Sequence, residues 1–431
     1  MTHFGILCPA AIGHLNPMCA LGRELQRRGH HVTLFGIPDI QPKVRNSGLD
    51  FWTIGEAEFP TGTLEHKYKQ LGQMSGIAGL NFTVNWLQQE TVMLFHDAPK
   101  ALKAAGVEAL LVDQVTPAGG TIADFLNLPF ITICNALLIN REAGVPPYFT
   151  QWSYSKAWWA RRRNQLGNFF LNRITKPFWE VILQQRHQWK LPTYSHRDDC
   201  YSRLAQICQL PAEYDFPRVN LPQCFHYTGP LQDPSGLEPV CFPSFSFPFE
   251  KLTGKPLIYA SLGTLQNRKW EIFQTIAEAC VGLDTQLAIS LGNPNSQESG
   301  WTLPGSPIVV PYAPHQQLIE RASLIVTHAG MNTVLGALSS GVPLVAIPVT
   351  NEQPGIATRV ARTGAGEVVP LARLSVPKLK AVIQRVLTED SYKNNASRLQ
   401  EAICRAGGVN RAADIIEQAI FTGKPVLAQI Q

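Results

Sequence analysis

The sequence predicts an α/β protein made of two Rossmann-like, doubly wound halves that face a central cleft. Two observations lead to this fold class. Short apolar runs alternate with amphipathic helices in the first third of the chain, and the alternation begins again near residue 256. Such alternation is typical of a parallel sheet covered by helices on both faces. At 431 residues, the chain also exceeds what one hydrophobic core usually supports.

The N-terminal half begins with a strand, a helix and a second strand. The run HFGILCP predicts the first strand, and apolar residues from Leu15 to Leu25 follow at helical spacing. Gly29 ends that helix before the strand HVTLFG. The runs EALLVDQ and PFITICN continue the series, with a helix around residues 121–126 between them.

A Pro-rich stretch separates the halves. Residues 228–256 hold six prolines, which neither a helix nor a central strand tolerates. The runs PLIYASLG, TQLAISLG, PIVVPY, SLIVTHAG and VPLVAIP then predict the strands of a second sheet. We expect an N-terminal domain at 1–227, a linker at 228–255, a C-terminal domain at 256–405, and a last helical segment at 406–431 that packs back on the N-terminal domain. Open parallel sheets bind ligands at the carboxyl ends of their strands, so functional groups should follow strands in both domains.

The composition excludes several classes of protein. With 45% hydrophobic and 16% charged residues, the chain is globular rather than disordered, and no apolar run approaches the roughly 18 residues of a membrane span. The start MTHFGILCPA lacks a basic leader, so we expect no signal peptide. Nine scattered cysteines without a CxxC pair favour reduced thiols in a cytoplasmic setting over a structural zinc site.

The positive charge is concentrated in one segment. Residues 141–190 hold nine Lys or Arg against two Glu, so this segment carries +7, whereas the whole chain carries +5. A nucleic-acid-binding protein of this size would spread its basic residues over a wider footprint, so we expect no nucleic acid partner. One basic segment rich in aromatic residues fits an anionic or membrane surface better.

The stretch THAGMNTVLGAL, from Thr327, lies where a strand gives way to a helix. The first backbone N–H groups of a helix have no internal partner, and the small Gly330 lets an anion reach them. Asn332 and Thr333 can add side-chain hydrogen bonds, and His328 can donate one more. The segment is therefore a candidate diphosphate site. An ordinary helix N-cap beside a packed histidine is the alternative.

On these residues the chain resembles the UDP-glycosyltransferase superfamily, inverting enzymes of the two-domain GT-B fold. THAGMNTVLGALSSGVPLVAIPVTNEQP looks like the donor-binding signature of that superfamily, and GHLNPMCALGRELQRRGHHVT like its N-terminal loop and first helix. YASLGT resembles the first loop of its C-terminal domain, and VVPYAPHQQLIERA the segment that opens the nucleotide site. MNTVLGAL and the tail RAGGVNRAADIIEQAI are most similar to bacterial carotenoid (zeaxanthin) glucosyltransferases.

The resemblance implies roles for individual residues on the donor side. The diphosphate would be held by Gly263, Thr264, His328, Gly330, Asn332 and Thr333. Tyr312 would lie against the nucleotide base, and the Ala313 backbone would pair with the edge of that base. Glu352 and Gln353 would read the sugar hydroxyls, although Glu and Gln also open many ordinary helices. The family usually binds ribose with an acidic residue where this chain has Gly336, so a thymidine diphosphate sugar would be tolerated beside a UDP-sugar.

His14 and Asp113 are the candidate catalytic pair. His14 follows the first strand in a loop, and Asp113 ends the strand EALLVD, which normally lies beside the first one in a doubly wound sheet. An acceptor hydroxyl needs a base with a pKa near neutrality, and a carboxylate would fix the tautomer of that base. A loop histidine and a helix-capping aspartate are the alternatives. The resemblance favours the pair, because the catalytic His and Asp of the family fall at these places.

No metal or other cofactor is expected. The chain has no DxD motif at a strand end, and the adjacent carboxylates of RDDC, residues 197–200, indicate solvated surface. Enzymes of the family that the chain resembles need no metal, since the helix dipole and His328 would supply positive potential for the leaving diphosphate. The reaction that the resemblance implies is a single in-line displacement, which gives a β-glycoside from an α-linked donor.

The acceptor site is expected in the middle of the N-terminal half. The segment 141–190 holds five of the nine tryptophans, and Trp152, Trp158 and Trp159 are candidates to wall a pocket for a large apolar acceptor. The arginines at 161–163 would rest on anionic lipid, which would give peripheral membrane association. The alternative is a helical hairpin with its tryptophans in the core and its arginines in water.

We therefore expect a cytoplasmic, inverting glycosyltransferase that moves a hexose, most simply glucose, from a UDP-sugar to a hydroxyl of a lipophilic acceptor such as a hydroxylated carotenoid. A UDP-sugar 2-epimerase, which shares the two-domain architecture, is one alternative. It needs neither an apolar acceptor pocket nor the pair of His14 and Asp113. A non-catalytic nucleotide-sugar-binding protein is the other alternative.

Overall fold

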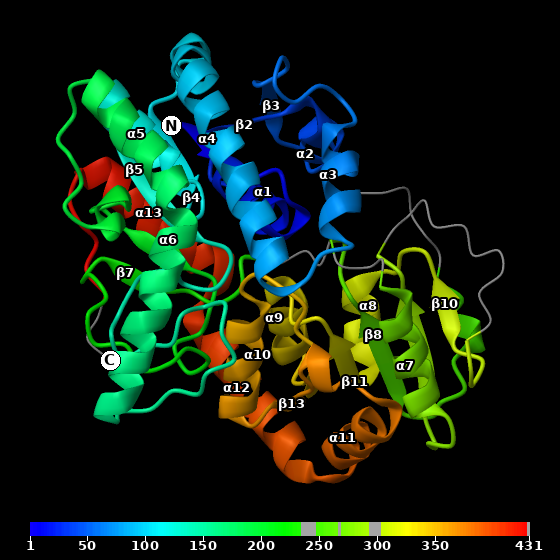
Figure 1. The fold of residues 1–431 in the computed structure, drawn as a ribbon. Coiled ribbons are helices and arrows are strands. Elements are labelled where there is room, and N and C mark those ends of the chain that lie inside the picture. Colours follow the sequence, from blue (N-terminus) through cyan, green and yellow to red (C-terminus); the bar gives the residue numbers. More distant parts are fainter. Residues whose placement is uncertain (234–246, 266–268, 293–302, 429–431) are drawn as a thin grey trace.

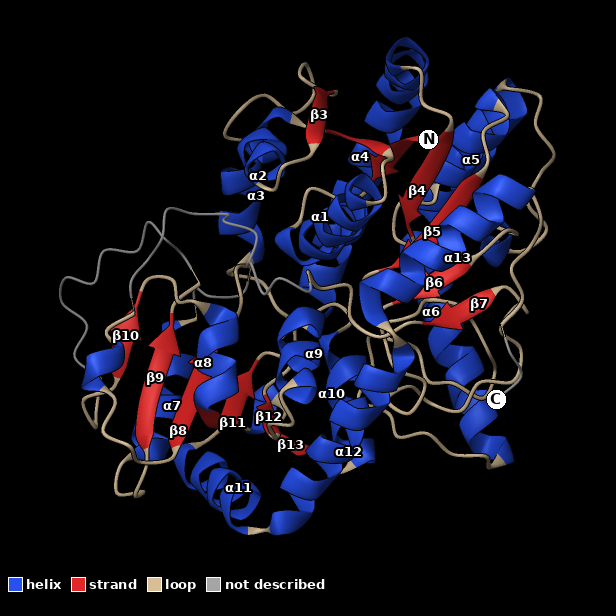
Figure 2. Cartoon of the chain, turned by 180° about the vertical axis from the view of Figure 1, so that it is seen from behind, coloured by secondary structure: helices blue, strands red, loops and turns tan. Residues whose placement is uncertain are grey.

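The computed structural model describes residues 1–233, 247–265, 269–292 and 303–428. Within these ranges the chain forms a seven-stranded and a six-stranded sheet, and every strand pairing in them is parallel. Helices cover both faces of each sheet, and the sheets lie in separate halves of the molecule (Figures 1 and 2). The predicted class of two Rossmann-like domains is confirmed.

The N-terminal sheet has the strand order β3-β2-β1-β4-β5-β6-β7. Its strands are β1 His3–Leu7, β2 His31–Gly36, β3 Asp50–Thr53, β4 Ala109–Asp113, β5 Phe130–Cys134, β6 Gln206–Cys208 and β7 Phe225–Tyr227. Its helices are α1 Ile12–Arg27, α2 Gln41–Asn46, α3 Thr63–Leu71, α4 Gly76–Ala105, α5 Ala118–Leu126 and α6 Trp158–Gln188. Leu7 pairs with Val112, so β1 and β4 end side by side, as the sequence predicts for a doubly wound sheet.

The C-terminal sheet has the order β10-β9-β8-β11-β12-β13. Its strands are β8 Leu257–Ser261, β9 Gln286–Ser290, β10 Ile308–Val310, β11 Ala322–Thr327, β12 Leu344–Ala346 and β13 Gly366–Val368. The helices around it are α7 Trp270–Cys280, α8 His315–Arg321, α9 Met331–Ser339, α10 Gln353–Thr363, α11 Val376–Thr388 and α12 Asp390–Ala406. Residues 234–246, within the predicted linker, lie outside the described residues.

The last helix, α13 Gly408–Thr422, packs against α1 of the N-terminal half (Figure 2). Arg28 donates to Asp414 at 2.6 Å and to Glu417 at 2.7 Å, and His30 lies 2.9 Å from Glu417. The chain therefore leaves the C-terminal sheet after α12 and ends on the other half of the molecule.

Two long helices, α4 and α6, pack against each other beside the N-terminal sheet (Figure 1). The segment that begins at Trp158 is one helix of 31 residues, so the alternative of a helical hairpin is wrong. Trp158 is 77% exposed and Trp159 51%. These two tryptophans therefore lie on the surface rather than in a core.

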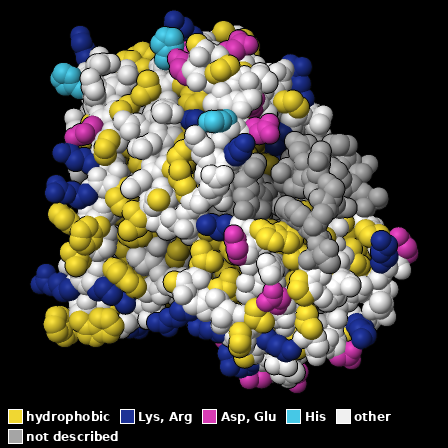
Figure 3. Space-filling view, turned by 45° about the vertical axis from the view of Figure 1, so that its right-hand side comes forward, with side chains coloured by type: hydrophobic (Ala, Val, Ile, Leu, Met, Phe, Trp, Pro, Cys, Tyr) yellow, Lys and Arg dark blue, Asp and Glu magenta, His cyan; other side chains and the backbone are white. Residues whose placement is uncertain are grey.

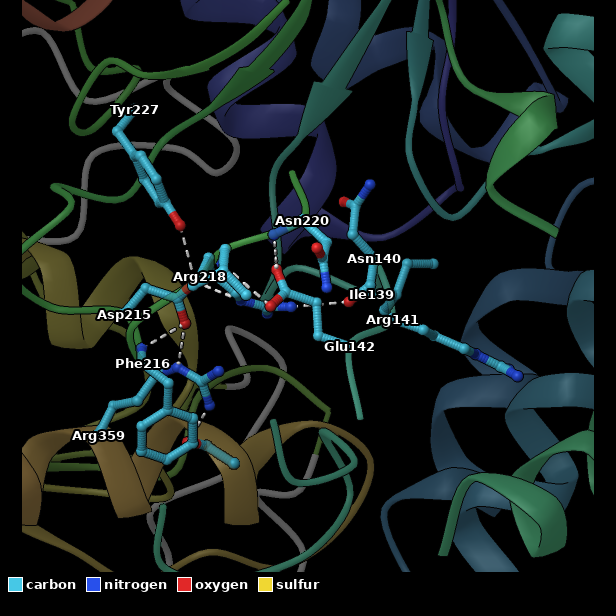
Figure 4. Close-up of polar contacts among 12 residues, drawn as sticks. Ile139, Asn140, Arg141, Glu142, Asp215, Phe216, Arg218, Asn220, Tyr227 and Arg359 are labelled. Carbon is cyan, nitrogen blue, oxygen red and sulfur yellow. Dashed lines mark hydrogen bonds and ion pairs between the residues drawn. The ribbon is translucent and has the colours of Figure 1, made fainter. Parts of the chain in front are cut away.

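A buried ion network joins the two halves (Figure 4). Asp215, between β6 and β7, accepts from Arg359 of α10 at 2.7 Å, from Arg218 at 3.0 Å and from the Tyr227 hydroxyl at 2.8 Å. Burial would raise the pKa of Asp215, but the two arginines outweigh it and hold that pKa at about 2. The carboxylate is therefore charged at neutral pH and ties α10 to the N-terminal half.

Candidate active site

His14 and Asp113 meet at the carboxyl edge of the N-terminal sheet. Asp113 is the last residue of β4, and His14 lies in the first turn of α1 rather than in the loop before it. His14 Nδ1 is 2.7 Å from Asp113 Oδ2. The His14 side chain is 18% exposed and lines a cavity, whereas that of Asp113 is 1% exposed behind it. The imidazole thus stands between the carboxylate and the cavity.

Donors surround both oxygens of the Asp113 carboxylate. Asn135 Nδ2 donates to Oδ2 at 2.7 Å, and the Val115 N–H donates to Oδ1 at 2.9 Å. A carboxylate only accepts, so His14 donates through Nδ1, which leaves its Nε2 unprotonated. Burial lowers the pKa of His14, but the charge and hydrogen bond of Asp113 outweigh it, so that pKa is raised above its usual value. The ring is therefore a base with a fixed tautomer.

The start of α9, in the C-terminal half, forms another wall of the same cavity. The first hydrogen bond of this helix runs from the Val334 N–H to Gly330 O. The N–H groups of residues 331–333 precede that bond and point out of the helix end. The first turn contains no acidic residue, so a negative group placed there meets the positive end of the helix dipole without repulsion.

His328 packs between Gly263 and Gly330. A Cβ on either glycine would lie 2.6 Å from the imidazole, so neither position admits a side chain unless the ring moves. Gly263 also has a φ of +69°, which favours glycine. Burial lowers the pKa of His328 to about 4. The ring on its own is thus neutral at pH 7, and its predicted role toward the leaving diphosphate stays a prediction.

One cavity of about 620 Å³ brings His14 together with every predicted donor-side residue. These residues are Gly263, Thr264, Tyr312, Ala313, His328, Gly330, Asn332, Thr333, Glu352 and Gln353. Their positions at one cavity agree with the predicted site, and their individual roles stay predictions. The side-chain carbonyl of Gln353 accepts the N–H groups of Val349 at 2.9 Å and Thr350 at 3.0 Å, so this part of the side chain holds a turn.

The apolar part of the cavity is built by α4 and α6. Its lining includes Leu80, Val84, Trp86 and Leu87 from α4, and Leu171, Thr175, Phe178 and Trp179 from α6. Trp152, Trp158 and Trp159 are not among the lining residues, which corrects the predicted acceptor region. Leu171 lies 13 residues beyond Trp158 on the same helix, which is about 20 Å along its axis. Trp152 instead packs against Arg163, whose Cζ lies 4.9 Å from the centre of the Trp152 ring.

Sequence reasoning missed several polar residues of the cavity. Glu90 of α4 is 7% exposed, and burial raises its pKa to about 7. On α8, Gln316 Nε2 donates to Glu320 Oε1 at 3.0 Å, and a Cβ at Gly336 would lie 3.6 Å from Gln316 Oε1. The single carboxyl in the first twenty residues of α4, and a Gln and a Glu one helical turn apart on α8, were the available signals.

The RDDC motif needs a further correction. It forms a short 3₁₀ helix, Arg197–Cys200, and both Arg197 and Asp198 line the cavity rather than lying on solvated surface. Across the described residues, no group of three or more His, Cys, Asp or Glu is placed to hold a metal ion. That the reaction needs no metal stays a prediction.

Comparison with known proteins decides the family. The model of the UDP-glucoronosyl and UDP-glucosyl transferase family matches residues 56–403. The chain belongs to this family. A zeaxanthin glucosyltransferase of Pantoea ananas is 34% identical over 99% of this chain and 98% of that protein. A second one, of Pseudescherichia vulneris, is 33% identical over 99% of this chain and 100% of that protein.

The fold of this glycosyltransferase also matches solved structures. CalG4, the calicheamicin glycosyltransferase, aligns with a TM-score of 0.74 at 20% identity, over 99% of this chain and all of that one. The GT-B fold is thereby confirmed. As a member of its family the enzyme uses a nucleotide-sugar donor and an acceptor, and the epimerase and non-catalytic alternatives find no support. None of the helices within the described residues is long and apolar enough to cross a bilayer.

Proposed function

We propose that this glycosyltransferase moves glucose from UDP-glucose to a hydroxyl of a hydroxylated carotenoid or a similarly large lipophilic alcohol. The names of the two zeaxanthin glucosyltransferases support this acceptor class and this sugar, and the apolar wall from α4 and α6 suits a lipophilic molecule. One observation carries the proposal. A histidine held by a buried carboxylate lies at the same cavity as the N-terminus of α9.

The proposed reaction is one in-line displacement. His14 Nε2 takes the proton of the acceptor hydroxyl while that oxygen forms a bond to the anomeric carbon. The bond from this carbon to the diphosphate breaks, and UDP leaves with the electron pair, so the α-linked donor gives a β-glycoside. Asp113 stabilises the imidazolium that forms. General base catalysis of this kind contributes about 10²–10⁴-fold in rate.

The C-terminal half stabilises the leaving group. The N–H groups at the start of α9 would meet the diphosphate, with the side chain of Thr333 and the loop at Gly263 and Thr264 beside it. Each charge-assisted hydrogen bond of this kind contributes about 1.5–3 kcal/mol. Tyr312 and the Ala313 backbone would hold the nucleotide base of the donor, and Glu352 with Gln353 would meet its sugar. The helix dipole and these donors supply the needed potential, so we propose no metal and no other cofactor.

The nucleotide preference depends on α8 in this proposal. Gly336 lacks the acidic side chain with which the family usually grips ribose. Gln316 lies beside it, and Gln316 and Glu320 both line the cavity. Glu320 would accept from ribose hydroxyls, and Glu320→Gln would then lower the preference for UDP over thymidine diphosphate. Competition of the two nucleotides for the donor site measures this preference. Equal loss of affinity for both nucleotides would remove the ribose role from Glu320.

We further propose a cytoplasmic enzyme that associates peripherally with membranes through α6. The side chains of Trp158, Trp159, Leu166, Phe169 and Phe170 are each more than half exposed, and Arg161, Arg162, Arg173 and Lys176 are exposed on the same helix. We call this set the α6 patch. Figure 3 shows hydrophobic side chains interleaved with Lys and Arg along the lower left edge of the molecule. Aromatic and basic groups together suit the surface of an anionic bilayer. The free thiols of all eight described cysteines fit the cytoplasm.

Replacing the arginines at 161–163 with alanine should reduce binding to vesicles that contain anionic lipid, by about 1 kcal/mol for each arginine that touches the surface. The control replaces three exposed arginines outside α6, Arg203, Arg373 and Arg398, which removes the same charge. Co-sedimentation with vesicles measures both variants. Equal binding by the two variants and the wild type would end the proposal of membrane association.

The central test is a UDP-release assay over several nucleotide sugars, with and without a panel of lipophilic alcohols, followed by mass analysis of the product. UDP release that depends on a hydroxylated carotenoid, with a hexose added to it, supports the proposal. Release of UDP without any acceptor, or conversion of the donor sugar alone, would overturn it.

A further inference from the structure

A closed ring of hydrogen bonds runs through both halves of the molecule at the active site. It starts at His14, which donates to Asp113 at 2.7 Å, and Asn135 Nδ2 donates to the same carboxylate oxygen at 2.7 Å. Gln209 Nε2 donates to the backbone oxygen of Asn135. The same Gln209 nitrogen donates to Asn332 Oδ1 at 3.2 Å.

The ring closes through the backbone next to the base. Asn332 Nδ2 donates to Gly13 O at 3.0 Å, and Gly13 is covalently joined to His14. Asn332 lies in the first turn of α9, so its amide links the C-terminal domain to the first turn of α1. Among the remaining members, Asp113 ends β4, Asn135 follows β5 and Gln209 follows β6, and these three strands are neighbours in the N-terminal sheet.

We propose that Gln209 and Asn332 are positioning residues that couple the donor-binding helix to the catalytic base. Gln209 fixes the orientation of the Asn332 amide by donating to its oxygen, which turns its nitrogen toward Gly13. The inference rests on the proposed role of His14 and goes beyond it, because neither side chain is given a direct part in proton transfer. The side chain of Asn332, assigned to the diphosphate in the sequence analysis, is here directed to the opposite domain.

The ring depends on the relative position of the two domains. Its bonds at Asn332 are 3.0 and 3.2 Å long, so a movement of α9 by about 1 Å away from α1 would take both beyond hydrogen-bond distance. The backbone beside His14 would then lose its contact with α9. The base is thus fully oriented only while α9 lies where it can also meet the leaving group.

The Asp113 carboxylate orients the Asn135 side chain. Asn135 is 2% exposed, and its Nδ2 donates to Asp113 Oδ2 at 2.7 Å. Its backbone oxygen accepts from Gln209 Nε2. Asn135 therefore links the carboxylate that holds His14 to the glutamine that holds Asn332.

The main test is Gln209→Met, which preserves the length of the side chain and removes both of its donated hydrogen bonds. We expect kcat to fall about tenfold through misplacement of the base, while the Kd of UDP and the KM of the acceptor change less than about twofold. In a His14→Ala background, the same change should have no further effect on kcat, because the group it positions is gone. A further tenfold loss in that background would overturn the proposal.

The matched control is Gln206→Met. Gln206 is a buried glutamine at the start of β6, the strand that Gln209 follows. It donates to Ser202 O and accepts from Asn140, but it lies outside the ring. We expect it to lower the melting temperature about as much as Gln209→Met does and to leave kcat unchanged. An equal loss of kcat in the two variants would mean that Gln209 acts only through stability. If Gln209→Met does not fold, Gln209→Ala removes the same donors with a smaller side chain and takes its place.

A readout without turnover separates this inference from the proposed function. Nitrogen NMR of histidine-labelled protein, with the His14 signal assigned by its loss in His14→Ala, reports the tautomer directly. We expect the Nδ1–H tautomer in the wild type and a mixture of tautomers in Gln209→Met. Identical His14 signals in the two proteins would overturn the coupling even if the enzyme proved active. An inactive wild type with the expected signals would count against the proposed function alone.

Discussion

The two walls of the cavity are built in different ways. The donor wall comes from short loops and one helix start, residues 263–264 and 328–333, and offers mainly backbone N–H groups and small side chains. The acceptor wall comes from the side chains of two long helices, α4 and α6, whose contributions lie about 90 residues apart in the sequence. In the proposed function a charged group would thus meet local backbone geometry, whereas an apolar molecule would meet a surface that only tertiary packing assembles.

Replacing His14, the side chain between the two walls, should have the largest effect on the rate of transfer. His14→Ala should lower kcat about 10²–10⁴-fold, because it removes the base, while the Kd of UDP stays within about twofold since the donor wall is untouched. Rates with a fixed acceptor and calorimetry with UDP measure the two quantities. Transfer at the wild-type rate would remove His14 from the mechanism, and a lost UDP site would show that the two walls are not independent.

The pH profile sharpens the same prediction. In the proposed mechanism His14 acts only when neutral, and Asp113 raises its pKa, so kcat/KM should fall as the pH drops through that raised value. Asp113→Asn removes the charge that raises the pKa, so the acid limb should move to lower pH. If the acid limb of the pH profile stays in place in Asp113→Asn, a group other than His14 controls that limb.

How much of each wall could be predicted follows from this difference. That the small and polar residues at 328–333 lie together at the cavity could be predicted, because a strand-to-helix junction has one local geometry. Their roles toward a nucleotide sugar were implied by the family resemblance and stay predictions. His14 and Asp113 could be paired because β1 and β4 are neighbours in any doubly wound sheet. The acceptor tryptophans were misplaced because the sequence does not state which turn of a 31-residue helix faces inward. Two further features depend on contacts that form only in the folded chain. The side-chain carbonyl of Gln353 accepts a backbone N–H, and burial raises the pKa of Glu90.

The next largest effect, on the free energy of unfolding, should come from the Asp215 ion network that joins the two halves. Asp215→Asn should lower the free energy of unfolding by about 3–5 kcal/mol, because it leaves the buried charges of Arg359 and Arg218 uncompensated (Figure 4). Urea unfolding measures the loss. The folded pKa of Asp215, about 2, lies below its unfolded value. The wild-type contribution, about 2–3 kcal/mol, is therefore complete above about pH 4 and lost as the pH falls through 2, and an acid-independent stability would contradict this account.

A side chain added to the donor wall should weaken only donor binding. Gly263→Ala places a methyl group 2.6 Å from the His328 ring at a φ of +69°. We expect the Kd of UDP to rise about tenfold through displacement of that ring, with the KM of the acceptor unchanged. The control is Gly29→Ala, whose φ of +88° carries the same backbone strain with nothing within 4 Å of the new methyl. Equal loss of UDP affinity in both variants would mean that backbone strain, and not displacement of the His328 ring, causes the loss.

The smallest expected effect, on the KM of the acceptor, distinguishes the cavity-lining part of α6 from its exposed surface. Trp179→Ala removes a ring from the cavity and should raise the KM of a detergent-dispersed acceptor about fivefold, which corresponds to about 1 kcal/mol of apolar contact. Trp158→Ala removes a ring that is 77% exposed and far from the cavity. It should leave that KM unchanged and raise the KM only when the acceptor is presented in vesicles. If Trp158→Ala instead raised the KM in detergent, the acceptor would contact the exposed start of α6, and the wall assigned to α4 and the middle of α6 would be wrong.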